Sequence, residues 1–435
     1  MNLDSYLKRF NGRPPIISVK PARNLSGIIV IPCYREPDWK TTLDCLAQCE
    51  SPTNPIEVLV ILNHSEVDCD AVKAEQHIAL QSIREWSIQH GSHQMQFHAI
   101  DASNLPKKHA GVGLARKIGM DEGLHRLNGA GNLRDGFIAC LDADCRCQAN
   151  YLLALEDHFQ QHPKTPGCSL YFEHPMDGDL TPETYDAVIK YELHLRYYVE
   201  ALRFASFPYA YHTVGSSMAV RPFAYMSQGG MNRKKAGEDF YFLNKIIPMG
   251  NFTEINDSVV IPSPRTSDRV PFGTGRAVAK YYGQSHFPTY AWSSILELKS
   301  FFTWVHQHDP FTDKSNRIPD SRHLPGIMSE YMDATNGWDQ WQKCIASTCD
   351  LKTYRRRFFQ WFDAFQCMKC LHFMRDKHHG EMEVTSATKN LFSAIGLESK
   401  NEGMDTIFML KKMRSHQRKG WSFSIQRKQI SGLTK

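Results

Sequence analysis

Four short apolar runs, separated by stretches with helical spacing, constrain the fold of the first 150 residues more than any other feature. The runs cover residues 27–34, 56–62, 95–100 and 136–141 and are rich in β-branched residues. Each is too short for a helix, and its apolar character indicates a buried strand. Strands of this kind that alternate with helices form parallel sheets covered by helices on both faces. The sequence therefore predicts an α/β fold with a mostly parallel, Rossmann-like sheet.

Three of these runs end at a polar residue or are followed directly by one, at the points where the predicted strands end. Tyr34, Asn63 and Asp142 occupy these positions. Parallel α/β sheets bind ligands beyond the carboxyl ends of their strands. We therefore expect these three side chains to lie at one ligand-binding edge.

The fourth run delivers the acidic triplet Asp142-Ala143-Asp144. Strand alternation directs the two carboxylates to one side and the alanine to the other. Carboxylate oxygens are ligands that Mg²⁺ and Mn²⁺ favour, and these cations usually keep phosphate oxygens in their shell. A metal site is predicted here; the alternative is an acidic turn that ends a strand.

A second acidic signal, Glu238-Asp239, opens a predicted helix about a hundred residues later. A carboxylate held at a helix terminus can act as a general base toward a hydroxyl. Acidic residues in a first helical turn are also favoured by the helix dipole without any function. Together with the first signal, the pair predicts chemistry on a nucleotide-linked substrate.

Several basic side chains and one histidine are candidates for the same site. Arg116 follows a glycine-bearing turn, and Arg265, Arg269 and Arg276 surround a glycine-rich loop that suits closure over a diphosphate. His286, after that loop, is a candidate metal ligand. The alternatives are a solvated helix face, an ordinary basic surface loop and a hydrogen-bonded or exposed histidine.

Composition shifts beyond residue 290, where tryptophans and basic residues cluster in helical-looking sequence. We therefore predict a helical C-terminal region and a domain boundary close to this point. The expected parts are an N-terminal leader (1–25), a catalytic domain (26–288) with a nucleotide-binding half (26–150) and an acceptor half (151–288), and the helical region (289–435).

Charge and cysteine content exclude some classes of protein. A net charge of +5 is compatible with anionic ligands but too small to indicate nucleic acid as a partner. The twelve cysteines are scattered and form no disulfide framework. Pairs at 145/147 and 367/370 have no second half at zinc-site spacing.

The sequence predicts a cytoplasmic protein that contacts the inner face of a membrane peripherally at most. It shows no signal-peptide pattern, and its apolar stretches are well short of the ~20 residues that span a bilayer. Residues 354–362 and 411–428 mix cations with aromatics, which is typical of an interfacial membrane helix. The same pattern is typical of a helix that packs its aromatics onto a domain.

Taken in order, these segments resemble the motifs of a family 2 glycosyltransferase with the GT-A fold. Residues 31–36 resemble its P-x-Y-N-E segment, and 58–65 its second strand. Residues 113–119 resemble its G-x-x-x-A-R-N-x-G helix. Residues 141–144 resemble its D-x-D motif, and 229–239 its G-G…G-E-D motif. The family typically transfers a sugar, with inversion, from a nucleotide-diphosphate sugar.

The resemblance implies roles for individual residues. Asp239, with Glu238 beside it, would be the base, and Asp144 would hold Mn²⁺ or Mg²⁺ together with Asp142. Tyr34, Glu36 and Arg116 would touch the nucleotide, and Asp142 the ribose or sugar. Arg269 of the basic loop, a candidate on its residue type rather than on the resemblance, would contact the donor diphosphate. Leu62-Asn63 replaces the family's paired acids after the second strand, so base recognition would rest on the Asn63 amide. The acceptor would be a carbohydrate or a lipid-linked molecule.

Two other functions compete with this one. A nucleotidyltransferase shares the sheet and the metal chemistry, but it normally needs a glycine-rich basic loop after the first strand, where residues 33–37 contain no glycine. A catalytically inactive binding or scaffold protein would use its tryptophan-rich C-terminal region as the interaction surface.

Overall fold

The chain forms two compact units, which we call unit 1 and unit 2. Unit 1 comprises Met1–Val188 and Thr213–Lys280, and unit 2 comprises Ile189–His212 and Tyr281–Lys435. The computed structural model describes residues 2–10, 12–269, 273–312, 324, 326–398 and 405–420. Unit 2 is discontinuous in sequence because the second half of one long helix belongs to it. The domain limits expected from the sequence stay predictions.

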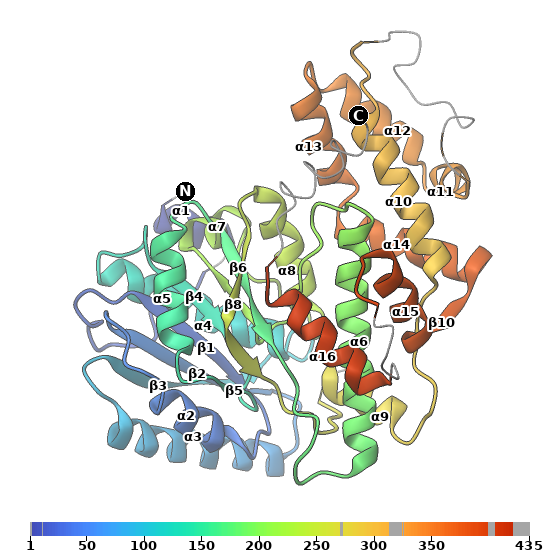
Figure 1. The fold of residues 1–435 in the computed structure, drawn as a ribbon. Coiled ribbons are helices and arrows are strands. Elements are labelled where there is room, and N and C mark those ends of the chain that lie inside the picture. The colour runs from blue at the N-terminus through green and yellow to red at the C-terminus, as the bar shows by residue number, and fades with distance from the viewer. Residues whose placement is uncertain are drawn as a thin grey trace. The chain divides into compact units, whose positions relative to one another are not determined.

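Unit 1 is built on an eight-stranded sheet with the order β3-β2-β1-β4-β7-β6-β8-β5 (Figure 1). The four strands β3, β2, β1 and β4 are parallel, β7 is antiparallel to both of its neighbours, and β5 is antiparallel to β8. The strands are β1 (Gly27–Cys33), β2 (Ile56–Ser65), β3 (Met95–Leu105), β4 (Phe137–Cys140), β5 (Arg146–Cys147), β6 (Gly167–Phe172), β7 (Met218–Val220) and β8 (Thr253–Ile261).

Helices flank this sheet. In sequence order they are α1 (Leu3–Phe10), α2 (Trp39–Ala47), α3 (Asp70–His90), α4 (Val112–Gly129), α5 (Tyr151–Gln161), the start of α6 (Pro182–Phe204), α7 (Pro222–Ser227), α8 (Glu238–Ile246), the 3-10 turn η1 (Ile247–Met249) and α9 (Thr274–Tyr281). Helix α4 packs on β1 and β2, α3 on β2 and β3, α2 on β5, and α5 on β8. The α/β class expected from the sequence, with a mostly parallel sheet flanked by helices, is confirmed.

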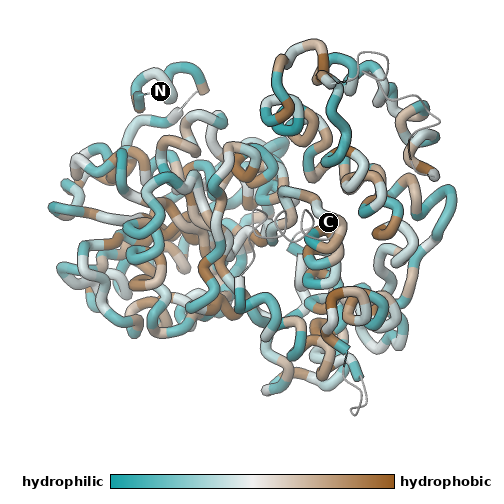
Figure 2. The backbone as a smooth tube through the Cα atoms, turned by 45° about the horizontal axis from the view of Figure 1, so that its top comes forward, coloured by the Kyte–Doolittle hydropathy of each residue, from teal (hydrophilic) through white to brown (hydrophobic). Residues whose placement is uncertain are grey.

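The core of unit 1 lies between the sheet and these helices. Strand β2 is buried along its whole length, and β1 is buried at every residue except Pro32. Figure 2 shows the hydrophobic stretches of this unit mainly in its interior and the hydrophilic stretches mainly at its outer turns. Strands β6 and β8 lie beyond the four apolar runs of the sequence analysis and were not expected.

The segment 1–25, which the sequence predicts to be a leader, contains helix α1 (Leu3–Phe10). Helix α1 buries Leu3 and Tyr6. The Tyr6 hydroxyl donates to Asp121 Oδ1 at 2.8 Å, and Lys117 Nζ donates to the Tyr6 oxygen at 3.1 Å. This burial could not be predicted from composition, because residues 1–25 are mostly polar and only two residues of the helix are buried.

Within its described residues, unit 2 has one two-stranded antiparallel pair, β9–β10, and its other regular elements are helices. Its elements are the end of α6, β9 (Pro288–Tyr290), α10 (Trp292–Gln307), α11 (Met328–Ala334), α12 (Gly337–Ala346), α13 (Leu351–Trp361), α14 (Ala364–Met374), the π-helix η3 (Arg375–His379), β10 (Glu381–Glu383), α15 (Val384–Ala394) and α16 (Thr406–Gln417). The helical C-terminal composition predicted this content.

Aromatic side chains form much of the core of unit 2. Tyr354 and Phe358 of α13 are fully buried, and Phe358 lies against Phe301 and Trp341. Two explanations remained from the sequence of segment 354–362, an interfacial membrane helix or a helix that packs its aromatics onto a domain. Packing onto a domain accounts for Tyr354 and Phe358. Residues 421–428 of the second such segment lie outside the described residues.

A buried ionic cluster joins α16 to α6 within unit 2. Glu192 accepts hydrogen bonds from Arg196 Nε at 2.7 Å and from Arg414 Nη2 at 2.7 Å. Glu192 and Arg196 are completely buried, and Arg414 is buried as well, so the carboxylate is shared by two guanidinium groups. Charges removed from water in this way require such partners.

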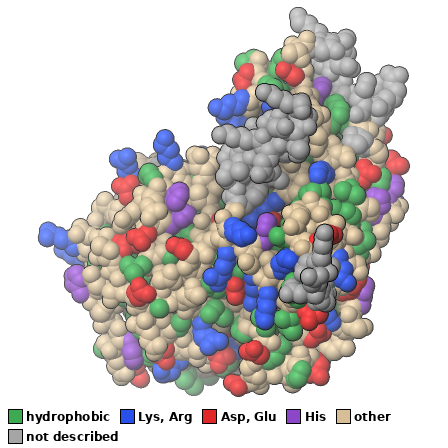
Figure 3. Space-filling model, in the orientation of Figure 1, with side chains coloured by type: hydrophobic (Ala, Val, Ile, Leu, Met, Phe, Trp, Pro, Cys, Tyr) green, Lys and Arg blue, Asp and Glu red, His purple; other side chains and the backbone are tan. Residues whose placement is uncertain are grey.

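No helix among the described residues is long and apolar enough to cross a membrane. Acidic and basic side chains are interspersed on the face shown in Figure 3. Contact of the C-terminal region with a membrane surface stays a prediction.

Candidate active site

Three parallel strands bring the predicted polar residues to one edge of the sheet in unit 1. Cys33, the last residue of β1, is paired with Leu62 of β2, so Tyr34 and Asn63 follow at the same level. On the other side of β1, Val30 is paired with Cys140 of β4, which leads to Asp142. The register of the strands therefore brings these three residues to one edge of the sheet, where the sequence analysis expects them.

Arg116 of α4 connects the two acidic motifs. Its Nη2 donates to Asp142 Oδ1, and its Nη1 donates to Glu238 Oε1. The side chains of Arg116 and Glu238 are each 3% exposed, whereas that of Asp142 is 39% exposed. A single buried guanidinium therefore joins the end of β4 to the start of α8. The fork geometry of arginine suits such a double contact.

Two glycines make room for this bridge. A Cβ on Gly215 would lie 2.5 Å from Arg116 Nη1. A Cβ on Gly113 would lie 2.3 Å from the Lys234 carbonyl oxygen. Only glycine permits the backbone to approach this closely at either position. The segment before β7 and the segment before α8 can therefore both lie against the start of α4.

The acidic pair at the start of α8 lies in a desolvated environment. Gly237 precedes it with a left-handed φ of 67°. Asp239 Oδ1 accepts a hydrogen bond from the Phe240 amide at 2.7 Å. Burial raises the pKa of Asp239 and that of Glu238, while the nearby Arg116 opposes both shifts. A carboxylate with a raised pKa is a stronger base than one in water.

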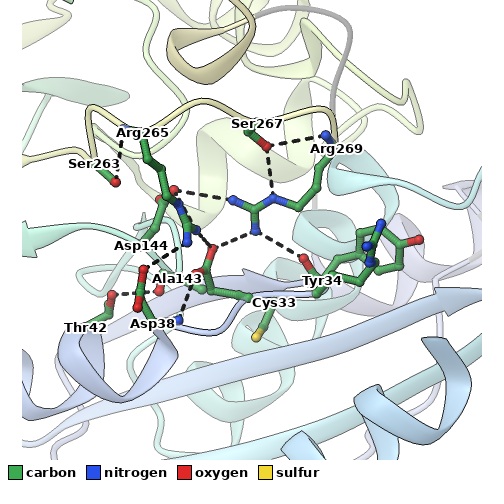
Figure 4. A network of polar contacts seen from close by, with 12 residues as sticks. Cys33, Tyr34, Asp38, Thr42, Ala143, Asp144, Ser263, Arg265, Ser267 and Arg269 are labelled. Atoms are coloured by element: carbon green, nitrogen blue, oxygen red, sulfur yellow. Dashed lines mark hydrogen bonds and ion pairs between the residues drawn. The ribbon is translucent and has the colours of Figure 1, made fainter. Parts of the chain in front are cut away.

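Two arginines from the segment after β8 reach the other side of the acidic triplet (Figure 4). Arg269 Nη1 donates to Glu36 Oε2 at 2.6 Å and to the Tyr34 carbonyl oxygen at 3.2 Å. Arg265 Nη2 donates to the same Glu36 carboxylate. Both guanidinium groups also approach Asp144 Oδ2, Arg265 at 3.4 Å and Arg269 at 3.5 Å. These arginines therefore lie directly beside the candidate metal-binding carboxylates.

Ligand atoms of Asp142, Asp144 and Cys145 lie within 4.8 Å of one another. Burial, together with the negative charges of Asp142 and Glu36, raises the pKa of Asp144 to about 6. Burial also raises the pKa of the Cys145 thiol well above its ordinary value, and a thiol is a softer ligand than a carboxylate. The oxygens of the two carboxylates are the hard ligands that fit Mg²⁺ or Mn²⁺.

Gln76 is a residue of this edge that the sequence analysis missed. Its Nε2 donates to the Cys33 carbonyl at 3.0 Å and to the Asn63 carbonyl at 2.9 Å, which ties the ends of β1 and β2 together. Gln76 stands at helical spacing from Leu80 and Ile83 on the buried face of α3. That spacing was the available signal. Asn63 Oδ1 is buried and accepts no hydrogen bond from any described residue.

His286 lies in unit 2, whereas Asp142 and Asp144 lie in unit 1. Its Nδ1 is 2.6 Å from Glu383 Oε2, which also accepts from the Phe287 amide at 2.8 Å. This carboxylate contact explains the position of the imidazole without a metal. The predicted role of His286 as a metal ligand stays a prediction, and so does the contact of Arg276, in α9, with a diphosphate.

Comparison with known proteins gives only distant similarities. No protein-family model matches the chain, and no curated protein matches it in sequence. Solved glycosyltransferase structures do match. TarS 1–349 from S. aureus in complex with UDP-GlcNAc is 11% identical with a TM-score of 0.38, over 91% of this chain and 93% of that chain. The mannosyltransferase PcManGT from Pyrobaculum calidifontis, in complex with GDP-Man and Mn²⁺, is 16% identical with a TM-score of 0.35, over 86% and 95%. At these values the similarity carries no argument about activity.

Replacing the bridging guanidinium should destabilise unit 1. Arg116→Met leaves Glu238 buried without its cation, and removing one partner of a buried ion pair typically costs about 3–5 kcal/mol. The free energy of unfolding, measured with urea, should fall by an amount in this range. Arg134→Met is the matched control, because the Arg134 side chain is 93% exposed. Equal effects of the two substitutions would show that the bridge has no special role in stability.

Asp144→Asn should stabilise the metal-free protein in a pH-dependent way. The folded-state pKa of about 6 exceeds the ordinary value of 3.8, so the wild type loses stability as pH rises between these values. The asparagine variant has no such loss, and its advantage should grow to on the order of 1–3 kcal/mol above pH 6. Urea unfolding with a chelator, at pH 4 and pH 8, measures this. An advantage that is the same at both pH values would contradict the raised pKa; Asp257→Asn, at an exposed position, is the control.

Proposed function

We propose that this protein is a glycosyltransferase that moves a sugar from a nucleotide-diphosphate sugar to an acceptor hydroxyl, with inversion and with a divalent cation. The observation that carries the proposal is the Arg116 bridge. It fastens the acidic triplet at the end of β4 to the acidic pair at the start of α8. A donor-binding edge and a candidate base thereby belong to one rigid site.

The donor diphosphate would lie beside the acidic triplet. Asp142 and Asp144 would hold Mn²⁺ or Mg²⁺, since their oxygens are the available hard ligands. When bound, the cation supplies positive charge to the leaving diphosphate. Arg265 and Arg269 lie against Asp144 and present guanidinium forks suited to phosphate oxygens. The two arginines would thus stabilise the charge that develops as the bond to the sugar breaks.

The sugar-transfer step needs a base on the acceptor side. The acceptor hydroxyl oxygen would form a bond to the anomeric carbon while the bond from that carbon to the diphosphate oxygen breaks. Asp239 would take the hydroxyl proton, for which its partly exposed carboxylate with a raised pKa is suited. Glu238 is engaged by Arg116, so we assign it a positioning role rather than proton transfer. One displacement of this kind inverts the anomeric configuration.

The nucleoside would contact the ends of β1 and β2. Tyr34 and Glu36 follow β1, and Asn63 has a buried amide oxygen that can accept a hydrogen bond from a base. The nucleotidyltransferase alternative lacks support here, because Glu36 occupies the segment after β1 and is paired with Arg265 and Arg269. A carbohydrate or lipid-linked acceptor and peripheral membrane contact stay predictions.

Donor binding can be tested by thermal unfolding with a panel of nucleotide sugars, each with and without Mn²⁺. A ligand that binds only the native state raises the melting temperature, by mass action. We expect at least one nucleotide sugar to do so in a Mn²⁺-dependent way and to be hydrolysed slowly without acceptor. Binding without any hydrolysis or transfer would favour the scaffold alternative. No shift with any nucleotide sugar would overturn the proposal.

Asp239→Asn should separate binding from chemistry. The amide keeps the size of the side chain but cannot take a proton, so the melting-temperature shift with donor should persist. Transfer to an acceptor should fall by about 10²–10⁴-fold, the usual contribution of a general base. The exposed Asp257→Asn substitution is the control and should leave transfer unchanged. Turnover by Asp239→Asn at the wild-type rate would remove Asp239 from the base role.

A further inference from the structure

Three cysteines from distant parts of the sequence meet beside the acidic triplet in unit 1. Cys147 of β5 lies between two thiols: its Sγ is 3.8 Å from Cys45 Sγ in α2 and 3.7 Å from Cys49 Sγ just after α2. Helix α2 packs directly on β5. A disulfide bond is about 2.05 Å long. Either pair can therefore be joined by a small movement of side chains.

The three thiols differ in their exposure to solvent. Cys45 is half-buried, whereas Cys49 is 9% and Cys147 is 8% exposed. An oxidant in solution therefore reaches Cys45 first. Cys49 and Cys147 are shielded from solvent, but Cys147 is in contact with Cys45 and can react with it after Cys45 has been oxidised.

Cys45 also has the surroundings of a reactive thiolate. The Cys147 amide donates to Cys45 Sγ at 3.3 Å, and the Cys147 thiol is positioned to donate as well. These hydrogen bonds, that from the Cys147 thiol above all, lower the pKa of Cys45 to about 6, while burial opposes the shift. When protonated, the Cys45 thiol can instead donate to the Cys147 carbonyl at 3.3 Å. Thiolates, not thiols, react with peroxides.

We propose that Cys45, Cys49 and Cys147 form a peroxide-oxidised thiol–disulfide site, with Cys45 as the attacking thiol and Cys147 as the resolving thiol. The Cys45 thiolate attacks one oxygen of hydrogen peroxide, the O–O bond breaks, and the second oxygen leaves as hydroxide, which becomes water. Cys45 is then a sulfenic acid. The Cys147 thiol attacks its sulfur, the S–O bond breaks, and water leaves with the Cys147 proton. In total, two thiols and one peroxide give one disulfide and two waters.

Cys49 gives the site a second stable form. Its thiol can attack Cys147 in the Cys45–Cys147 disulfide, which releases the Cys45 thiol and leaves a Cys49–Cys147 disulfide. This exchange conserves electrons and needs no further oxidant. The disulfide then joins the two least exposed sulfurs, and Cys45 is reduced again.

The cluster is directly connected to the candidate metal site. Thr42, one turn before Cys45 in α2, donates from its hydroxyl to the Ala143 carbonyl at 2.8 Å (Figure 4). Cys147 follows Asp144 by three residues. Drawing α2 and β5 together therefore shifts the backbone that carries Asp142 and Asp144. Weaker binding of Mn²⁺ to the oxidised protein follows, and this consequence rests on the proposed function.

The disulfide itself is tested on the full-length protein, without any assay of transfer. The reduced protein is treated with hydrogen peroxide, and the remaining free thiols are then blocked with an alkylating reagent. Peptides are mapped by mass spectrometry without reduction, and their fragment spectra distinguish Cys45 from Cys49. We expect a Cys147 cross-link to Cys45 or Cys49 that dithiothreitol reverses. The proposal is overturned if Cys45 and Cys147 remain free thiols after the exposed Cys69 and Cys349 have been oxidised.

Single substitutions assign the order of the steps. Cys147→Ser should leave Cys45 as a sulfenic acid that dimedone traps, and Cys45→Ser should slow formation of the cross-link about tenfold or more, because the remaining thiols are buried. Cys69→Ser is the control and should cross-link like the wild type. If Cys147→Ser does not fold, the alkylation rate of Cys45 in the wild type replaces it: Cys45 should react several-fold faster than Cys69 at pH 7. A slower reaction would overturn the assignment of Cys45 as the attacking thiol.

Titration of Mn²⁺ into reduced and oxidised protein tests the coupling. Weaker binding after oxidation, restored by dithiothreitol, supports it, and equal binding of the two forms overturns it. If the reduced protein binds no Mn²⁺, the proposed function fails while the thiol–disulfide site stands on the peptide map. The two failures are therefore distinguishable.

Discussion

The contact between Arg116 and two carboxylates is the interaction on which the candidate site depends. Asp142 follows β4 and Glu238 begins α8; Glu238 is buried and needs a cation at this depth, whereas Asp142 is partly exposed. The guanidinium fixes both because its planar fork meets two oxygens at once. Backbone elements from three parts of the chain converge on this group, and Gly215 leaves the space for it. The site is therefore assembled by charge compensation inside the fold rather than by a flexible loop.

The acidic triplet has a second set of cations on its outer side. Arg265 and Arg269 lie beside Asp144 and also hold Glu36, which is 5% exposed. Burial and like charge nevertheless raise the pKa of Asp144. This balance is typical of functional sites, where a local loss of stability is tolerated because the arrangement is needed for binding.

Much of the sheet could be predicted because its strands are buried on both faces. The runs that became β1, β2 and β4 ended where the structure ends them to within a few residues, so Asp142 was placed at the correct edge. Strands β6 and β8 were missed because short apolar segments beside long helices give no distinct periodicity. The contacts of Arg116 and Cys147 depend on which distant segments meet. Local patterns carry no such information, although the helical spacing of Gln76 from Leu80 and Ile83 was a signal from which its burial could have been predicted.

Helix α6 has a practical consequence for dividing this protein into fragments. It begins in unit 1, but from Ile189 onward it belongs to unit 2, where Glu192 balances Arg414 of the last described helix. Cleavage after Lys280 would therefore yield no independent C-terminal piece. One fragment would retain the second half of α6 without the helices that cover it, and the other would expose Arg414, which is buried in the intact protein. Limited proteolysis or gene truncation at that junction is thus unsuited to isolating either half.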